Sequence, residues 1–250
     1  ERQSYYFRRS QAILQRDDFI SIIIDGADQA AYALPHFLEK DKAASSQKLP
    51  VYLMGALVHG RACYAFTYLN NRKHGTNIVI ECLHRIFVHQ KNKYGSLPRV
   101  LYLQLDNTCK QNKNKFMIGY MGCLIQWGLF AQVYLSFLPV GHTHEDVDQY
   151  FSKIAGYLRT HNAYDRQGIV EAAKNYYPNW AGDDFEIHTD HVERATNFSC
   201  WIGTKLANFS CHVKLFQQYR IRRKREEDMV SVQGRARCAE VLQDSRSVWK

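Results

Sequence analysis

The sequence has 250 residues, of which 46% are hydrophobic and 13% aromatic, and its formal net charge is +9. This composition is typical of a globular chain with a full core and excludes a disordered one. No apolar run approaches the roughly 18 residues that a membrane-spanning helix needs. The positive charge favours an anionic partner, with nucleic acid ahead of membrane, and a charge that only aids solubility is the alternative.

Motifs of several common enzyme classes are absent from the sequence. We find no P-loop, no GxSxG elbow and no dinucleotide fingerprint, so we expect no nucleotide cofactor. The seven cysteines form no CxxC pair, which argues against a zinc ribbon and a disulfide scaffold and for a reducing, intracellular compartment. The first residue is Glu1 and not Met, so we expect a piece of a longer protein.

Short apolar segments and amphipathic stretches predict an α/β fold with the element order βββαβαβα, after a leading basic helix. The segments PVYLMGALV and ACYAFTYL, separated by three residues that include a glycine, predict a hairpin. The later strands alternate with helices and should pair in parallel, giving a mixed five-stranded sheet flanked by helices. The expected strands cover residues 19–25, 50–58, 62–69, 99–105 and 131–138, and the expected helices cover residues 1–16, 76–91 (with Thr76 as N-cap), 113–127 and 144–160.

The character of the sequence changes after Pro178. We therefore expect a core at residues 1–178 and a small, β-containing C-terminal region at residues 179–250. That region carries weak strand patterns at about residues 211–221 and 230–241, and nothing in it predicts a role.

Two carboxylates, Asp25 and Asp106, each follow an apolar strand directly. A strand end holds such a group at the edge of a sheet, where a cleft can form, and converging carboxylates favour a hard cation such as Mg²⁺. Each also has a structural explanation. Asp25 precedes Gly26 in a common turn pair, and Asp106 can form an Asx turn. Asp28 is the substitute for Asp25 if the strand register slips.

A third acid is expected near the start of the helix at residues 144–160. If Thr143 is the N-cap, Glu145 and Asp146 fall in the first turn, where capping and the helix dipole explain acidic residues. Asp148 lies beyond that turn beside the apolar stripe, so we favour Asp148 as the third site residue. Asp146 and Glu145 stay open as alternates.

The element order and the three acids resemble the ribonuclease H-like superfamily of DDE/D transposases and integrases. That superfamily places acids on the first strand, after the fourth strand and on the last helix, which match Asp25, Asp106 and Asp148 here. The stretches IIIDGADQ, LQLDNTCKQNKN and GHTHEDVDQYFS are also similar to an uncharacterised eukaryotic family of transposon-derived domains. The resemblance covers about residues 1–165 and implies a transposase-like nuclease that acts on DNA in the nucleus.

If the three acids meet, they can hold two divalent ions, Mg²⁺ or Mn²⁺, with Asp25 bridging them. One ion would activate water or a DNA 3′ hydroxyl, and the other would stabilise the leaving 3′ oxygen, which is phosphodiester cleavage or strand transfer. A homo-oligomer is compatible with this activity. The alternative is a domesticated descendant, catalytically inactive, that keeps the fold and binds DNA or protein.

Histidine, asparagine and basic side chains complete the candidate site. His144, with His142 and Asn107 as accessory groups, can orient water or protonate a leaving group, and imidazoles at a helix start can also simply bond backbone. Lysines at the start of the helix at 113–127 oppose its dipole, so a nearby phosphate would explain them, and ordinary solvated lysines are the alternative. Basic residues at 220–225 can track a phosphate backbone or protect an edge strand. The candidate DNA-binding residues are Lys110, Lys113, Lys115, Arg222, Arg223, Lys224 and Arg225.

Overall fold

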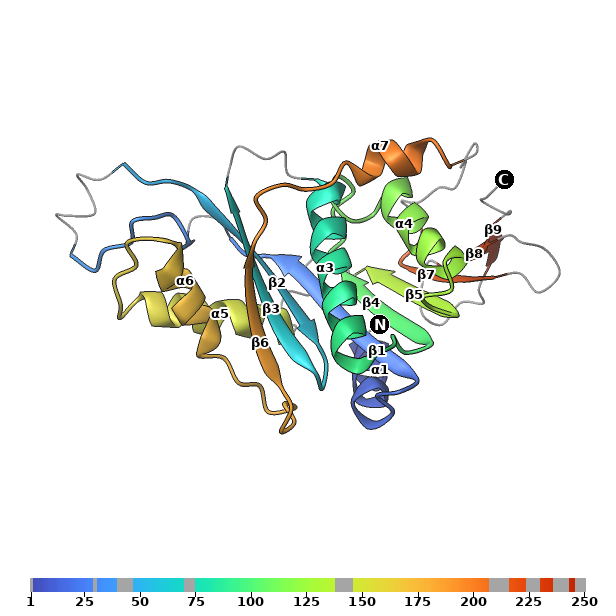
Figure 1. The fold of residues 1–250 in the computed structure, drawn as a ribbon, viewed down its shortest axis with the longest axis horizontal. Helices are drawn as coiled ribbons and strands as arrows, with labels where there is room; N and C mark the ends of the chain where they lie inside the picture. Colours follow the sequence, from blue (N-terminus) through green and yellow to red (C-terminus); the bar gives the residue numbers. More distant parts are fainter. Residues whose placement is uncertain are drawn as a thin grey trace. The chain divides into compact units, whose positions relative to one another are not determined.

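The computed structural model of the chain forms two compact units (Figure 1). Unit 1 comprises Glu1–Ile22, His74–Gly141 and Ala195–Lys250, and unit 2 comprises Ile23–Lys73 and His142–Arg194. The residues that the structure describes are 2–28, 31–39, 47–69, 75–137, 146–206, 216–223, 230–235 and 243–245. The division does not follow the predicted boundary near residue 178, because residues after it pack into both units.

Helices and strands alternate as in an α/β protein. The described residues form nine strands, so the prediction of a five-stranded sheet is wrong, and the four additional strands all lie after residue 178. None of the described helices is long and apolar enough to span a membrane. The elements are α1 (Arg2–Leu14), β1 (Phe19–Gly26), β2 (Val51–Val58), β3 (Ala62–Leu69), α3 (Thr76–Tyr94), β4 (Val100–Leu105), α4 (Lys115–Gln126), β5 (Gln132–Phe137), α5 (Asp146–Leu158), α6 (Arg166–Lys174), β6 (Glu186–His191), α7 (Phe198–Gly203), β7 (Gln218–Arg223), β8 (Val230–Arg235) and β9 (Gln243–Ser245).

The sheet of unit 1 has the strand order β4-β5-β7-β8-β9. β4 and β5 pair in parallel, as predicted for strands joined by a helix, and β5, β7, β8 and β9 pair antiparallel. β7 therefore has a neighbour on each side. The idea that its arginines protect an edge strand is wrong, because β5 and β8 occupy both edges of β7.

Side chains alternate between two different faces of this sheet. The apolar face is fully buried, and α4 packs against β5, β7 and β8. The opposite face is polar and aromatic, and α1 lies on it: the Arg8 guanidinium sits over the rings of Tyr102 and Tyr134 and donates to Ser136 Oγ at 2.6 Å. The register aligns the apolar residues Leu101, Leu103 and Leu105 of β4 with Val133, Leu135 and Phe137 of β5, and Val133 and Leu135 with Ile221 and Tyr219 of β7.

Unit 2 is also built on a mixed sheet, in which β3 pairs antiparallel with β2 and parallel with β6. The predicted hairpin is confirmed, and Gly60 in its turn has φ 74°, in the left-handed region that favours glycine. Helix α5 packs on β2 and α6 packs on β3 and β6. A Cβ added at Gly55 would lie 2.6 Å from Cε1 of Phe151, so α5 approaches β2 as closely as a glycine permits.

Most predicted elements before residue 160 exist within a few residues of their expected bounds. The apolar stripe of α3 is buried as expected, but Thr76 is not its N-cap: Gly75 holds that position, and the Thr76 hydroxyl donates to the backbone oxygen of Lys110 at 3.3 Å. Helices α6 and α7 and strand β6 were not predicted. The sequence EIHTDH of β6 is polar throughout, so no apolar period marks it.

Candidate functional site

Asp106 follows the last residue of β4 in unit 1 and is half-buried. Three donors bind a single oxygen of its carboxylate. Oδ1 accepts hydrogen bonds from the backbone N–H of Thr108 at 2.9 Å, from the Thr108 hydroxyl at 2.6 Å and from Nδ2 of Asn112 at 2.6 Å. The first of these is the Asx turn that the sequence suggested, so part of this arrangement is structural. All three bonds together fix the orientation of the carboxylate.

The segment between β4 and α4 is itself held at several points. The backbone N–H groups of Asn112 and Lys113 donate to the backbone oxygen of Thr108 at 2.8 and 2.9 Å. Asn114 caps α4, accepting from the backbone N–H groups of Phe116 and Met117, and its Nδ2 donates to the Thr76 hydroxyl at 2.7 Å. This segment is therefore bound to the start of α3 as well as to α4, which gives Asp106 a rigid support.

Two oxygen atoms in this segment have no donor among the residues that the structure describes. Oδ2 of Asp106 accepts no hydrogen bond from any described residue. Oδ1 of Asn112 is buried without a partner among the described residues, and the Asn112 side chain is only 3% exposed. A buried acceptor without a donor costs about 1–3 kcal/mol, so a ligand that supplies positive charge would be favourable here. Carboxylate and amide oxygens are the ligand types that Mg²⁺ and Mn²⁺ take, so these residues fit such an ion.

The three candidate lysines of unit 1 have different environments. Lys110 and Lys115 are exposed, as DNA-binding residues would be. Lys113 is 3% exposed, its Nζ lies 5.5 Å from the centroid of the Phe137 ring, and it donates to Oε1 of Gln217 at 3.4 Å. The ammonium of Lys113 therefore packs inside unit 1 and supports the segment. Asn107 is half-buried beside Asp106.

The candidate acids of unit 2 lie at the end of β1 and in the first turn of α5. Asp25 is half-buried, and its Oδ1 accepts from the backbone N–H of Gly26 at 2.8 Å. Asp28 is exposed. Asp146 is 4% exposed and lies in an ion pair with His59, whose Nε2 is 3.4 Å from Oδ2 of Asp146. This pairing gives Asp146 a structural role within unit 2.

The expectation that Asp148 lies beyond the first turn of its helix is wrong. Helix α5 begins at Asp146, so Asp148 falls in the first turn, where the helix dipole stabilises a carboxylate. Asp148 is half-buried. Asp25 and Asp148 belong to unit 2 and Asp106 to unit 1, so the meeting of all three stays a prediction. His142, His144, Glu145, Lys224 and Arg225 lie outside the described residues.

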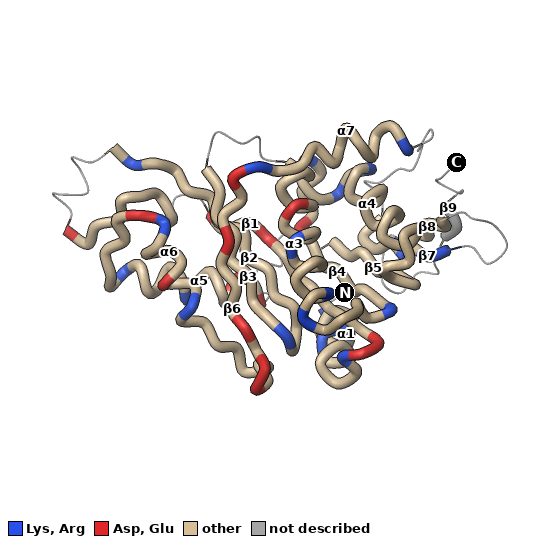
Figure 2. Tube along the Cα trace, in the orientation of Figure 1, with Lys and Arg blue, Asp and Glu red and all other residues tan. Residues whose placement is uncertain are grey.

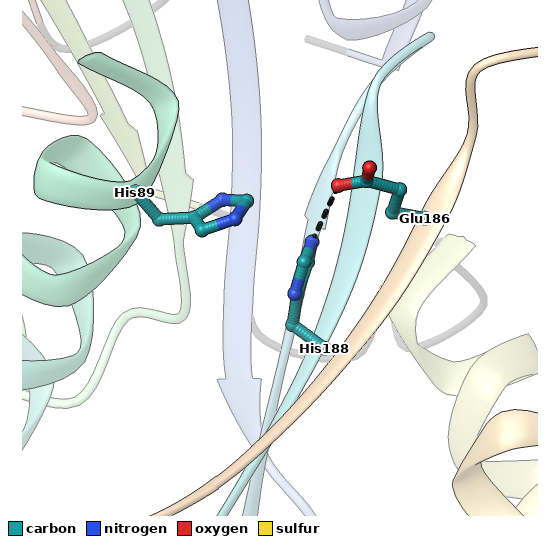
Figure 3. Close-up of side chains that lie close together, drawn as sticks. All are labelled: His89, Glu186 and His188. Atoms are coloured by element: carbon teal, nitrogen blue, oxygen red, sulfur yellow. Dashed lines mark hydrogen bonds and ion pairs between the residues drawn. The ribbon is translucent and has the colours of Figure 1, made fainter. Parts of the chain in front are cut away.

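A second group of polar side chains in unit 2 was not predicted. Nε2 of His188 lies 2.8 Å from Oε2 of Glu186 on β6 (Figure 3). The centroid of the His188 ring lies 5.0 Å from that of Tyr64 of β3, in a stacked arrangement. Glu186 and His188 are two residues apart on one strand, so they share a face. His89, which Figure 3 also labels, belongs to α3 of unit 1.

Arg222 and Arg223 stand at the end of β7 and are exposed, as expected for residues that bind a polyanion. Arg220 on the same strand is half-buried, and its guanidinium lies 5.8 Å from the centroid of the Tyr134 ring. Register explains the difference: Arg220 stands opposite Tyr134 in the middle of the sheet, and Arg222 stands opposite Gln132 where β5 begins.

Comparison with known proteins gives one match. The family DUF7869, described as a domain of unknown function, matches residues 41–239. No curated protein and no solved structure matches the chain. The match spans well over half of the chain, including the segment that carries Asp106, helix α5 and strands β2 to β8. The chain therefore belongs to the DUF7869 family.

Proposed function

We propose that this protein is a transposase-like nuclease domain with a ribonuclease H-like core, which uses Mg²⁺ or Mn²⁺ to cleave or transfer phosphodiester bonds in DNA, in the nucleus. One observation carries the proposal. The Asp106 carboxylate is oriented through Oδ1 by three donors, while its Oδ2 and the buried Oδ1 of Asn112 have no described donor. An oriented carboxylate with one unbonded oxygen is what a metal ligand requires.

The location of Asp106 agrees with this function. β4 and β5 are parallel neighbours, and open α/β sheets bind ligands outside the carboxyl ends of parallel strands. Asp106 is the first residue after β4 at that end. Two protein oxygens do not complete a coordination shell, and we propose Asp25 and Asp148, each at the end of a regular element, as further ligands.

The chain's own residues then have defined roles. Thr108 and Asn112 orient Asp106, and exposed basic side chains such as Lys110 and Lys115 neutralise phosphates of the DNA. A bound divalent ion would supply Lewis-acid chemistry toward the scissile phosphate and the attacking hydroxyl. The Asp106 carboxylate is oriented before DNA binds, because its hydrogen bonds with Thr108 and Asn112 are already formed in the protein alone.

Calorimetric titration with Mn²⁺ tests the proposal directly. We expect the wild-type chain to bind Mn²⁺ and the Asp106→Asn variant to lose that binding, because the amide replaces a charged ligand by a neutral one. Asp17→Asn is the matched control, since Asp17 is an exposed acid of the same unit. Asp25→Asn and Asp148→Asn test the convergence of the three acids. Mn²⁺ binding that is unchanged in Asp106→Asn would overturn the assignment of the site.

Nicking of supercoiled DNA with Mg²⁺ or Mn²⁺ tests the chemistry. The wild type should nick, Asp17→Asn should nick equally, and Asp106→Asn should fall to background while keeping the wild-type circular dichroism spectrum. A wild-type chain that binds DNA but neither binds Mn²⁺ nor nicks would replace this proposal by the inactive, DNA-binding alternative.

A further inference from the structure

A cleft of about 1200 Å³ opens in unit 1 where β4 and β5 begin and β7 ends. Among the described residues that line it, four are arginines and one, Asp18, is an acid. The arginines are Arg99 just before β4 and Arg220, Arg222 and Arg223 on β7, a strand whose basic residues are blue in Figure 2. Every described lining residue belongs to unit 1.

The register of the sheet brings these cations together although they are far apart in the sequence. Val100 of β4 pairs with Gln132 of β5, and Gln132 pairs with Arg222 of β7. Arg99 immediately precedes Val100. Arg99 and Arg222 therefore lie at the same end of the aligned strands β4, β5 and β7. Ser231 of β8 stands opposite Arg222 and extends the same row.

The arginines differ in how they are held. Arg220 lies over the Tyr134 ring, and with the Gln132 amide in its hydrogen-bonding orientation the amide oxygen accepts from Arg220 Nη2 at 3.0 Å. The exposed guanidinium groups of Arg99 and Arg222 make no hydrogen bond or ion pair with any described residue. The positive charges of the arginines in this cleft repel one another, and an anionic ligand would reduce that repulsion. The fork of a guanidinium suits the paired oxygens of a phosphate.

The rest of the lining is largely apolar. Phe19, Leu129 and Phe130 are among these residues, and the backbone of Gly128 contributes. A duplex presents sugar–phosphate backbones and base edges to a protein, whereas a single strand also exposes the flat faces of its bases. A cleft with both arginines and an apolar wall therefore suits a single strand better, with phosphates on the arginines and bases on the wall.

We propose that this cleft binds a single nucleic-acid strand without a metal ion, through Arg99 and Arg222 in the first place. This inference rests on the proposed DNA-binding function and specifies which surface binds and which form of nucleic acid it prefers. The cleft lies at the opposite end of β4 from Asp106, and six residues of extended chain span roughly 20 Å. Strand binding and metal binding are therefore separable.

Fluorescence anisotropy with a labelled oligothymidylate strand, in EDTA, tests the inference. The double variant Arg99→Gln/Arg222→Gln should bind at least tenfold more weakly than the wild type. Its salt slope, the fall of log K with log[salt], should be smaller by about 1.4, since each lost phosphate contact on a single strand removes about 0.7. The matched control is Arg159→Gln/Arg194→Gln, which removes two exposed arginines outside the cleft and should change affinity less than twofold.

Several outcomes would overturn the inference. Equal losses in the cleft variant and its control would mean that net charge alone attracts the strand. Tighter binding of a duplex with the same number of phosphates would exclude the single-strand preference.

Two further outcomes separate this inference from the proposed nuclease. An Asp106→Asn variant that loses Mn²⁺ binding but binds the strand normally in EDTA would support strand binding by the cleft. A wild type that binds the strand but no Mn²⁺ would contradict the proposed nuclease and still support the cleft.

Discussion

Nδ2 of Asn112 lies 2.6 Å from Oδ1 of Asp106, across six residues of chain that turn back on themselves between β4 and α4. The same Nδ2 lies 3.4 Å from the Thr108 hydroxyl, which in turn donates to Asp106. Two side chains thus donate to the same oxygen of one carboxylate. The relationship is useful because it can be broken without removing the carboxylate itself.

Removing the amide of Asn112 should weaken Mn²⁺ binding while leaving Asp106 in place. Loss of such a supporting hydrogen bond costs about 10- to 100-fold in metal affinity. Asn112→Leu also removes Oδ1, the amide oxygen proposed to face the ion, so we expect a loss of at least that size by calorimetry. Thr108→Val should have a smaller effect, because the backbone N–H of Thr108 still donates to Asp106.

Thr108→Ser is the matched control for Thr108→Val, since it keeps the hydroxyl and should bind Mn²⁺ like the wild type. If Val and Ser variants bind Mn²⁺ equally well, the Thr108 hydroxyl has no part in orienting the carboxylate. If Asn112→Leu binds like the wild type, Asn112 serves only the fold of the segment.

Asp146 should matter for stability more than Asp148, although both lie in the first turn of α5. Asp146→Ala removes the buried partner of His59, and breaking a buried ion pair costs about 3 kcal/mol of the free energy of unfolding. Asp148→Ala should cost about 0.3–1 kcal/mol through the helix dipole. Denaturant unfolding in the absence of metal measures the free energy of unfolding of both variants. Equal losses would contradict a special stabilising role for the pair of His59 with Asp146.

Two glycines of unit 2 should respond oppositely to alanine. Gly55→Ala places a Cβ 2.6 Å from Phe151, so the ring must move, and overpacking of this kind costs about 1–3 kcal/mol. Gly156→Ala places a Cβ in open space on α5, and a helical alanine is more stable than glycine by about 0.5–1 kcal/mol. Urea unfolding of the two variants checks the signs. A Gly55→Ala variant as stable as the wild type would show that β2 and α5 can separate at no cost.

Ionised Glu81 on α3 should stabilise the folded state, and this part of the free energy of unfolding should be lost in acid. Burial acts to raise the pKa of Glu81, but the hydrogen bond from the backbone N–H of Thr196 and the pairing with Arg85 outweigh it, so the pKa lies below the ordinary value of 4.5. The folded state therefore binds the proton more weakly than the unfolded state does. The stabilisation by ionised Glu81 is complete above pH 4.5 and disappears as the pH falls through the lower folded value.

Unfolding free energies of wild type and Glu81→Gln, compared at neutral pH and at steps below pH 4.5, test this prediction. The difference between the two proteins should shrink as the pH falls, because protonated Glu81 resembles glutamine. Glu171→Gln, an exposed substitution, is the control and should give a constant difference. A wild type and Glu81→Gln that lose stability in parallel would contradict the lowered pKa.

Part of the candidate site could be predicted from the sequence and part could not. Asp106 and its turn followed from one strand end and one local motif, LDNT. Thr108 and Asn112 were missed as supporting residues, because a six-residue spacing within a loop carries no period. A run of polar residues after a strand-end acid, DNTCKQNKN, is the only local signal that could have pointed to them. Lys113 was predicted to bind DNA, but its side chain is buried beside Phe137. That burial could not be foreseen, because Phe137 belongs to β5, which begins about twenty residues further along the chain.

The sequence by itself determined the α/β class, the β2–β3 hairpin, the parallel pairing of β4 with β5 and the bounds of most elements before residue 160. Those features follow from apolar periodicity and turn residues, which act over a few neighbours. Tertiary structure decided the division into two units, the insertion of β7 beside β5 and the gathering of Arg99 with Arg222 in one cleft. These depend on hydrogen-bond register between segments more than eighty residues apart, and no local pattern of residues encodes which strand becomes the neighbour of another.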